Sequence, residues 1–191
     1  GAHLIADHVS CSVVNAGDGG HEHPTQGLLD ALSLGEATGR TDWNFEGLHV
    51  LIVGDVMHWR VARSNIACLT GLGARVTLVG PPLLVPRSME CLGCEVSHDL
   101  DGLAPGADAI MTLRVQFERG ATLASAREYC EHYALTRERA ARTRAFFMHP
   151  GPMNRGLEID EDVAKSERSL ILQQVANGVR VRMAVLERAA G

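Results

Sequence analysis

The stretch His49-Val50-Leu51-Ile52-Val53-Gly54 decides the fold, and its pattern returns downstream as Arg75-Val76-Thr77-Leu78-Val79-Gly80. Both are short apolar runs that end in glycine, which is typical of strands buried on both faces of a sheet. The chain between them places Ala62, Ile66 and Leu69 on one face of a helix. A strand, a helix and a strand within about 30 residues form a βαβ unit, which predicts a parallel sheet with a right-handed crossover.

Short apolar segments and amphipathic segments alternate along most of the remaining chain. Further strands are predicted at residues 12–14, 94–97, 108–113 and 145–148, and further helices at residues 24–37, 87–92, 124–133 and 136–144. The sequence therefore predicts an α/β fold with a doubly wound, three-layer parallel sheet of the Rossmann-like kind.

The C-terminal stretch carries apolar residues three and four positions apart, which predicts a helix with one apolar stripe. The stripe consists of Leu172, Val175, Val179, Met183 and Leu186. The alternation of Val and Arg over residues 179–182 leaves a strand open as the alternative.

The composition is that of an ordinary globular protein, with 191 residues of which 46% are hydrophobic. Because 18 Lys and Arg stand against 23 Asp and Glu, we expect neither nucleic acid nor an anionic membrane as a partner. There is no apolar run of about 18 residues to span a membrane, and the first residues do not resemble a signal peptide. Five scattered cysteines suit a reducing compartment, so we expect a cytoplasmic protein.

Polar segments follow the predicted strands, at the edge where open parallel sheets bind their ligands. They read NAGDGGHEHPTQ at residues 15–26, GDVMHWRVARSN at residues 54–65, LRVQFER at residues 113–119 and HPGPMNRG at residues 149–156. Two arginines from separate loops suit a dicarboxylate, because each can bind one carboxylate through two charge-assisted hydrogen bonds. A His or Gln donor suits a carbonyl group, and the carbonyls of a Pro-Gly-Pro turn suit an amino group. The segments therefore favour a site for an electrophile and an amino dicarboxylate, with no covalent nucleophile.

Other kinds of site fit these segments less well. The turn after the strand at residues 49–54 is not G-x-G-x-x-G and the chain has no P-loop, which argues against a dinucleotide and a P-loop site. His21 and His23 could share a metal, but no third ligand follows from the spacing, so no metal site is predicted. The helix dipole disfavours a purely structural Arg60 at a helix start, which favours a ligand there. Arg114 could equally lie on a solvated edge, and His149 is more simply a hydrogen-bonded strand-end residue than a catalytic base.

Together and in this order, the four segments resemble the catalytic chain of aspartate carbamoyltransferase, in the aspartate/ornithine carbamoyltransferase family. The stretch QVANGVRVRMAVL at residues 174–186 resembles the last helix of that family. The resemblance implies transfer of the carbamoyl group of carbamoyl phosphate to the amino group of L-aspartate. The products would be N-carbamoyl-L-aspartate and phosphate, in an early step of pyrimidine biosynthesis, and no cofactor is implied.

The resemblance also implies which residues hold carbamoyl phosphate. His23 and Gln26 would contact the carbamoyl group and act in catalysis, and the backbone carbonyls of Gly151 and Pro152 would hold the carbamoyl NH₂ group or the incoming amine. Catalysis would then rest mostly on positioning and on electrostatic stabilisation of an oxyanion.

For aspartate, the resemblance implies that Arg60 and Arg114 bind the two carboxylates and that Gln116 assists. Trp59 departs from the family, which commonly has a small residue such as serine at this position. Its bulk would shift Arg60, which puts the affinity for aspartate in question.

By the same resemblance, residues 1–38 would be the tail of a carbamoyl-phosphate domain and an interdomain helix. Residues 39–168 would be the aspartate-binding domain, and residues 169–191 a helix that returns to the first domain. Because the phosphate-binding loop of the family would precede Gly1, we expect little or no turnover from these residues alone.

An intact enzyme would be a homotrimer, with a regulatory chain or a dihydroorotase as possible partners. An ornithine carbamoyltransferase and a non-catalytic aspartate-binding or assembly module of the same fold are the alternatives.

Overall fold

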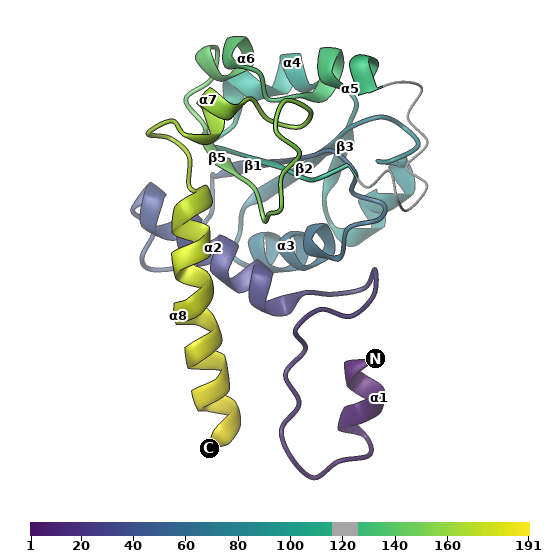
Figure 1. Cartoon of the computed structure of the whole chain (residues 1–191), viewed down its shortest axis with the longest axis vertical. Helices are drawn as coiled ribbons and strands as arrows, with labels where there is room; N and C mark the ends of the chain where they lie inside the picture. The colour runs from purple at the N-terminus through teal and green to yellow at the C-terminus, as the bar shows by residue number, and fades with distance from the viewer. Residues whose placement is uncertain (116–125) are drawn as a thin grey trace.

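The fold is seen in a computed structural model that describes residues 1–115 and 126–191 (Figure 1). One sheet in this part of the chain holds β1 (His49–Val53), β2 (Arg75–Val79), β3 (Glu95–Ser97), β4 (Ala109–Thr112) and β5 (Phe146–Met148). The strand order is β3-β2-β1-β4-β5, and each neighbouring pair is parallel. The chain builds outward from β1 to β3 and then returns to place β4 on the other side of β1. The order therefore reverses between β1 and β4, which confirms the doubly wound sheet.

Helices cover both faces of the sheet and make three layers (Figure 1). One face carries α2 (Pro24–Thr38) and α3 (Arg60–Gly71), and a 3₁₀ helix, η1 (Arg87–Leu92), connects β2 to β3. The other face carries α4 (Leu100–Leu103), α5 (Ala126–Tyr133), α6 (Arg137–Ala141) and α7 (Glu161–Ala164), with the 3₁₀ helix η2 (Ala104–Gly106) after α4.

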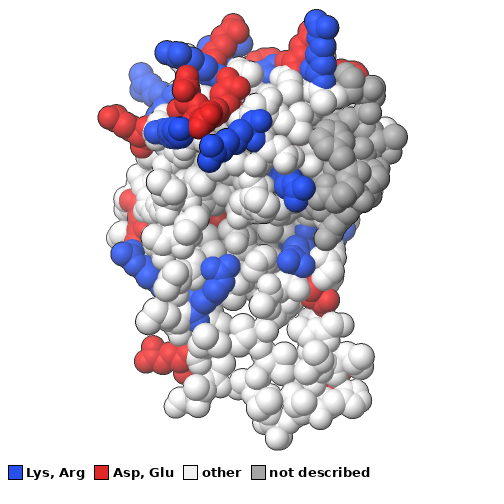
Figure 2. All heavy atoms as spheres, viewed as in Figure 1, with Lys and Arg blue, Asp and Glu red and all other residues white. Residues whose placement is uncertain are grey.

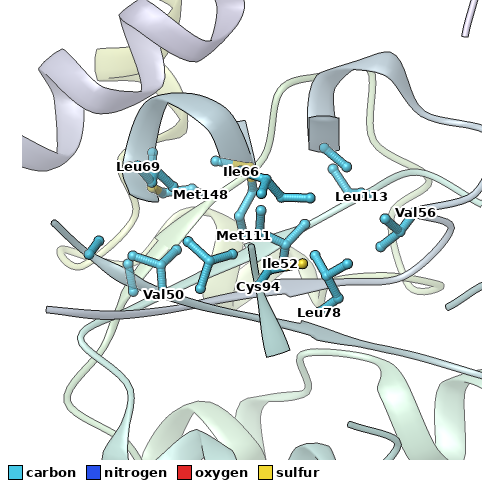
Figure 3. Close-up of a cluster of buried hydrophobic side chains, with 14 of the residues drawn as sticks. Val50, Ile52, Val56, Ile66, Leu69, Leu78, Cys94, Met111, Leu113 and Met148 are labelled. Atoms are coloured by element: carbon cyan, nitrogen blue, oxygen red, sulfur yellow. The ribbon is translucent and has the colours of Figure 1, made fainter. Parts of the chain in front are cut away.

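The strands are buried on both faces because their apolar side chains alternate between two clusters. Ile52 of β1 belongs to the cluster on the α3 side, together with Ile66 of α3 (Figure 3). Its neighbour Leu51 belongs to the cluster on the opposite face, together with Ile110 of β4. All five residues of β1 are buried, as the continuous apolar run predicts.

One predicted strand is absent from the structure, and one predicted helix is described only in part. The strand predicted at residues 12–14 is wrong, because this stretch is irregular and runs beside the domain rather than along the sheet (Figure 1). Its valines favour an extended chain, but a strand also needs a neighbour to pair with. The helix predicted at residues 124–133 is observed as α5 from Ala126, and residues 124 and 125 lie outside the described part. The short helices α1 (Ala2–Ala6), α4 and α7 were not expected, since four or five residues hardly show a helical period.

The C-terminal helix α8 (Ile171–Ala190) confirms the helical interpretation over the strand alternative. Its first turns pack against α2, and the rest extends away from the sheet beside the N-terminal segment (Figure 1). The five apolar residues of its stripe are exposed, with Leu172 at 82% and Val175 at 68%. Much of the surface at this end of the molecule is uncharged in the view of Figure 2. Within the described residues no helix is both long and apolar enough to cross a membrane.

Candidate functional site

The carboxyl ends of β1 and β4 lie side by side, and the loops that follow them touch. Gly54 directly follows β1 with a φ of +125°, a conformation that favours glycine. A Cβ atom there would lie 2.9 Å from the carbonyl oxygen of Leu113 and 2.9 Å from the hydroxyl oxygen of Tyr129. Glycine at this position therefore lets the segment at residues 54–65 approach the segment that carries Arg114.

The segment at residues 15–26 lies against the start of α3. The backbone N–H of His23 donates a hydrogen bond to Ser64 Oγ at 2.8 Å, and Arg60 Nη1 donates to the carbonyl of Gly19 at 3.4 Å. A Cβ on Gly17 would come within 2.7 Å of the Arg60 guanidinium carbon. The structure thus brings together the two segments that contain His23 and Arg60.

The electrostatics of His23 follow from this packing. Burial, followed by the charges of Arg60 and Arg182, lowers the pKa of the His23 imidazole below its usual value. Lowering of the pKa keeps the ring neutral at pH 7, because the unperturbed value is already about 6.5. A neutral imidazole can still donate one N–H to a carbonyl oxygen, which is the role that the sequence analysis expects.

A buried carboxylate holds the segment that carries Arg114. The backbone N–H of Val115 donates to Glu158 Oε1 at 2.8 Å, and the backbone N–H of Asn154 donates to Glu158 Oε2 at 2.8 Å. The Asn154 side-chain amide donates to Glu158 Oε1 at 2.8 Å and to the carbonyl of Val115 at 3.3 Å. Burial raises the pKa of Glu158, opposed by these hydrogen bonds. Arg114 is thereby fixed relative to the loop after β5, whereas Gln116 lies outside the described residues.

The loop after β5 forms a tight turn around His149. The backbone N–H of Gly151 donates to His149 Nδ1 at 2.8 Å, and Gly151 has a φ of +67° before a cis peptide bond to Pro152. Burial lowers the pKa of His149 to about 4, so the ring is neutral at pH 7. Its Nε2 is buried with no partner among the described residues. This geometry supports a role in shaping the turn rather than that of a base.

Among the described candidate site residues, Gln26 is the one whose side chain is buried. Its Nε2 donates to Asp30 Oδ1 at 2.9 Å, and the same oxygen accepts from Gln174 Nε2 of α8 at 2.8 Å. Asn65 Nδ2 of α3 donates to Asp30 Oδ2 at 2.7 Å. Asp30 is fully buried, and burial raises its pKa to about 6 although the three hydrogen bonds and Arg182 lower it.

The buried Asp30 predicts how stability depends on pH. Its folded pKa lies above the ordinary value of 3.8, so ionisation costs more in the folded state than in the unfolded state. Stability contributed by this group is present at low pH and is lost as pH rises between about 4 and 6. We expect the difference between the free energies of unfolding of the wild type and of Asp30→Asn to fall by about 2 kcal/mol between pH 4 and pH 7. Urea unfolding of both proteins at a series of pH values measures this difference. A difference that stays constant or rises with pH would contradict the raised pKa of Asp30.

Sequence reasoning missed four residues that shape this site: Asp30, Glu158, Gln174 and Arg182. Asp30 left a signal, since it is an acidic residue four positions after Gln26 and therefore lies on the same face of α2. The others left none, because their partners are far away in the sequence.

Trp59, which was expected to displace Arg60, precedes α3 and packs against the core with Nε1 buried and unpartnered among the described residues. That displacement stays a prediction.

Comparison with known proteins agrees with this geometry. The profile of a family described as aspartate/ornithine carbamoyltransferase, Asp/Orn binding domain, matches residues 46–189. The catalytic subunit of aspartate carbamoyltransferase from Myxococcus xanthus is 55% identical over 189 residues, which are 97% of this chain and 62% of that protein. The corresponding subunit from Thermobifida fusca is 55% identical over 97% of this chain and 59% of its own length.

Solved structures show the same fold. The catalytic subunit of aspartate transcarbamoylase from M. jannaschii superposes with a TM-score of 0.81 at 28% identity, over 98% of this chain and 62% of that one. Ornithine carbamoyltransferase from Thermus thermophilus gives a TM-score of 0.82 at 26% identity, again over 98% of this chain and 62% of that one.

The doubly wound sheet and the loops at its reversal point define a substrate-binding domain of the carbamoyltransferase class. The chain belongs to the aspartate/ornithine carbamoyltransferase family, in which it matches the Asp/Orn binding domain. Within that family it is a homologue of aspartate carbamoyltransferase catalytic subunits, and it spans about 60% of the length of the curated relatives it matches.

Proposed function

We propose that this chain supplies the aspartate-binding part of an aspartate carbamoyltransferase. One observation carries the proposal: three of the four selected segments, and the described start of the fourth, are joined by hydrogen bonds or close contacts at one edge of the sheet. Residues 15–26 contact α3, Gly54 approaches Leu113, and Val115 is bound to the loop after β5. These contacts support the proposal because they bring together the segments that carry the side chains suited to an electrophile and to an amino dicarboxylate.

Aspartate is proposed to bind between Arg60 and Arg114. Arg60 begins α3, which follows β1, and Arg114 lies two residues after β4, so the two arginines belong to segments that follow neighbouring strands. A guanidinium binds a carboxylate through two parallel hydrogen bonds, so two separated arginines select a ligand with two carboxylates. Gln116 is proposed to assist from the same loop as Arg114.

Carbamoyl phosphate is proposed to bind beside aspartate, against His23 and Gln26 and the carbonyls of Gly151 and Pro152. The amino nitrogen of aspartate forms a bond to the carbamoyl carbon, and the bond from that carbon to the phosphate oxygen breaks. The departing phosphate keeps the electron pair of that bond and takes up the proton that the amine loses. The neutral His23 donates a hydrogen bond to the carbonyl oxygen as negative charge develops there. The carbonyl oxygens of the turn accept hydrogen bonds from the NH₂ group, and no cofactor takes part.

The exposed apolar surface supports a larger enzyme. The stripe on α8 and a groove of about 430 Å³ between α2, α3 and α8 give apolar faces to a further domain of the kind that the longer relatives have. We propose that residues 1–38 and 169–191 join this chain to such a domain, and that the intact enzyme is a cytoplasmic homotrimer. Because phosphate would meet few ligands on this chain, we expect little turnover from it alone.

Ligand selectivity tests the proposed function. We expect calorimetry to show weak binding of succinate, the dicarboxylate that keeps both carboxylates of aspartate, and no binding of L-ornithine. Binding of ornithine in preference to succinate would favour the ornithine branch of the family. A chain that binds neither, even beside a complementing N-terminal domain from a relative, would favour an assembly module.

A further inference from the structure

A hydrogen-bonded chain runs through the interior from Gln26 to the turn at Gly151. Asp30 Oδ1 accepts from Gln26 Nε2 and from Gln174 Nε2, so one carboxylate oxygen joins α2 to α8. The carbonyl oxygen of the Gln174 side chain accepts from the backbone N–H of His149 at 3.0 Å. His149 Nδ1 in turn accepts from the backbone N–H of Gly151 at 2.8 Å. Four hydrogen bonds therefore connect the two segments that are proposed to hold the carbamoyl group.

The chemistry of Asp30 fixes the orientation of its partners. At pH 7 the carboxyl group is ionised, since its pKa of about 6 lies below that pH, and a carboxylate only accepts hydrogen bonds. Gln26 must therefore turn its Nε2 toward Asp30, and Gln174 must do the same. Gln174 is then left with its carbonyl oxygen toward His149, as observed. For Gln26, the end that Asp30 does not hold is the carbonyl oxygen Oε1, which suits an N–H donor on a ligand.

A packing role alone explains less of this arrangement. An ionised carboxyl group that is fully buried among helices is costly, and apolar residues of the same size would join α2, α3 and α8 more cheaply. The charged group that acts on Asp30 is Arg182 of α8, and the amides of Gln26, Asn65 and Gln174 donate to its carboxylate. The thiol of Cys68 on α3 is also near, and burial followed by the charge of Asp30 raises its pKa, which keeps it neutral below pH 9. What the carboxylate adds over an apolar residue is a fixed direction for these amides.

We propose that Asp30 is a positioning residue of the carbamoyl site, which holds the Gln26 amide and, through Gln174 and His149, the Gly151 turn in one fixed arrangement. The proposal rests on the proposed function for the identity of the ligand. The hydrogen-bonded connection between Gln26 and Gly151 does not depend on the proposed function. An experiment can therefore refute the connection without refuting the proposed function, and the reverse.

A pH titration followed by NMR tests the connection in the 191-residue chain without any ligand. We expect the side-chain amides of Gln26 and Gln174 and the backbone amides of His149 and Gly151 to shift with one common midpoint near pH 6. The His149 ring does not contribute in this range, because its pKa is about 4. Separate midpoints for Gln26 and Gly151, or no shift at Gly151, would overturn the proposal.

Two variants test whether the titration of Asp30 causes the common midpoint. Asp30→Asn should abolish it at every one of these amides, and Gln174→Ala should abolish it at His149 and Gly151 but keep it at Gln26. The second variant decides the matter even if the first does not fold. Glu36→Gln is the matched control, because Glu36 is an exposed carboxyl on the same helix that also binds α8, through Asn177. It should leave all four shifts unchanged.

Calorimetry with two ligands distinguishes a specific positioning role of Asp30 from a general loss of order in the folded chain. Succinate tests the arginines alone, and N-carbamoyl-L-aspartate adds the carbamoyl group. In Asp30→Asn we expect about a tenfold loss of affinity for N-carbamoyl-L-aspartate and an unchanged affinity for succinate, as for one lost hydrogen bond of good geometry. Adding Gln26→Ala to this variant should cause no further loss. Equal loss for both ligands would overturn the positioning role, whereas a wild type that binds neither would refute the proposed function and leave the titration to decide the connection.

Discussion

Replacing Arg114 by alanine is expected to abolish detectable succinate binding to this chain. In the proposed function Arg114 binds one of the two carboxylates of the ligand, and a charge-assisted pair of hydrogen bonds to a guanidinium is the strongest contact proposed for it. For a ligand that already binds weakly, loss of about 2–3 kcal/mol lowers the affinity by roughly 30-fold to 150-fold, beyond measurement. Calorimetric titration of succinate into the wild type and Arg114→Ala gives the comparison.

The matched control for this experiment is Arg137→Ala. Arg137 lies on α6 with its side chain 83% exposed, where it pairs with Asp162 at 3.6 Å. The Arg137→Ala replacement removes one positive charge from the chain but none from the segments that carry Arg60 and Arg114. We expect unchanged succinate binding, and equal losses in the two variants would show that net charge rather than the Arg114 site governs binding.

Replacing Glu158 by alanine is expected to lower both stability and succinate affinity. The carboxylate accepts from the backbone N–H groups of Val115 and Asn154 and from the Asn154 amide, and its side chain is fully buried. Its removal leaves these donors unpaired in the interior, at about 1–3 kcal/mol each. We expect a total loss of about 2–5 kcal/mol in the free energy of unfolding, less than the sum over the three donors because the variant no longer buries a carboxylate. Urea denaturation measures this loss. Succinate affinity should fall as well, because Arg114 is the residue before Val115.

A neighbouring glutamate gives the control for this loss. Glu161 is half exposed and pairs with Lys165 at 2.6 Å and Arg155 at 3.2 Å. Exposed ion pairs contribute little to stability, so Glu161→Ala should unfold near the wild-type midpoint and bind succinate equally well. If Glu158→Ala behaved like Glu161→Ala in both assays, the anchoring of the Arg114 loop would be wrong.

The sheet could be predicted because its strands are short apolar runs with distinct ends. Residues 50–54 and 76–80 are buried throughout, as expected for strands covered on both faces, whereas Arg75 at the start of β2 is exposed. The valines at residues 13 and 14 carry the same local preference, yet they form no strand, because pairing depends on a neighbour that sequence does not display. The short helices α4 and α7 fall below the length at which a helical period can be seen.

The site was predictable only where its residues follow strands. The positions after β1 and β4 drew attention to Arg60 and Arg114, and the Gly-rich segment before α2 drew attention to His23 and Gln26. Asp30 and Gln174 are different, because they meet across 144 residues and each looks like an ordinary polar residue of its own helix. Their contact follows from the packing of α8 on α2, which depends on the whole fold.

A crystal structure of this chain with succinate bound would show directly whether the two arginines hold the dicarboxylate. We expect one carboxylate within hydrogen-bond distance of the Arg60 guanidinium and the other within hydrogen-bond distance of Arg114, each at about 2.7–2.9 Å. Succinate bound elsewhere on the chain, or bound at the strand ends without contacting either arginine, would contradict it.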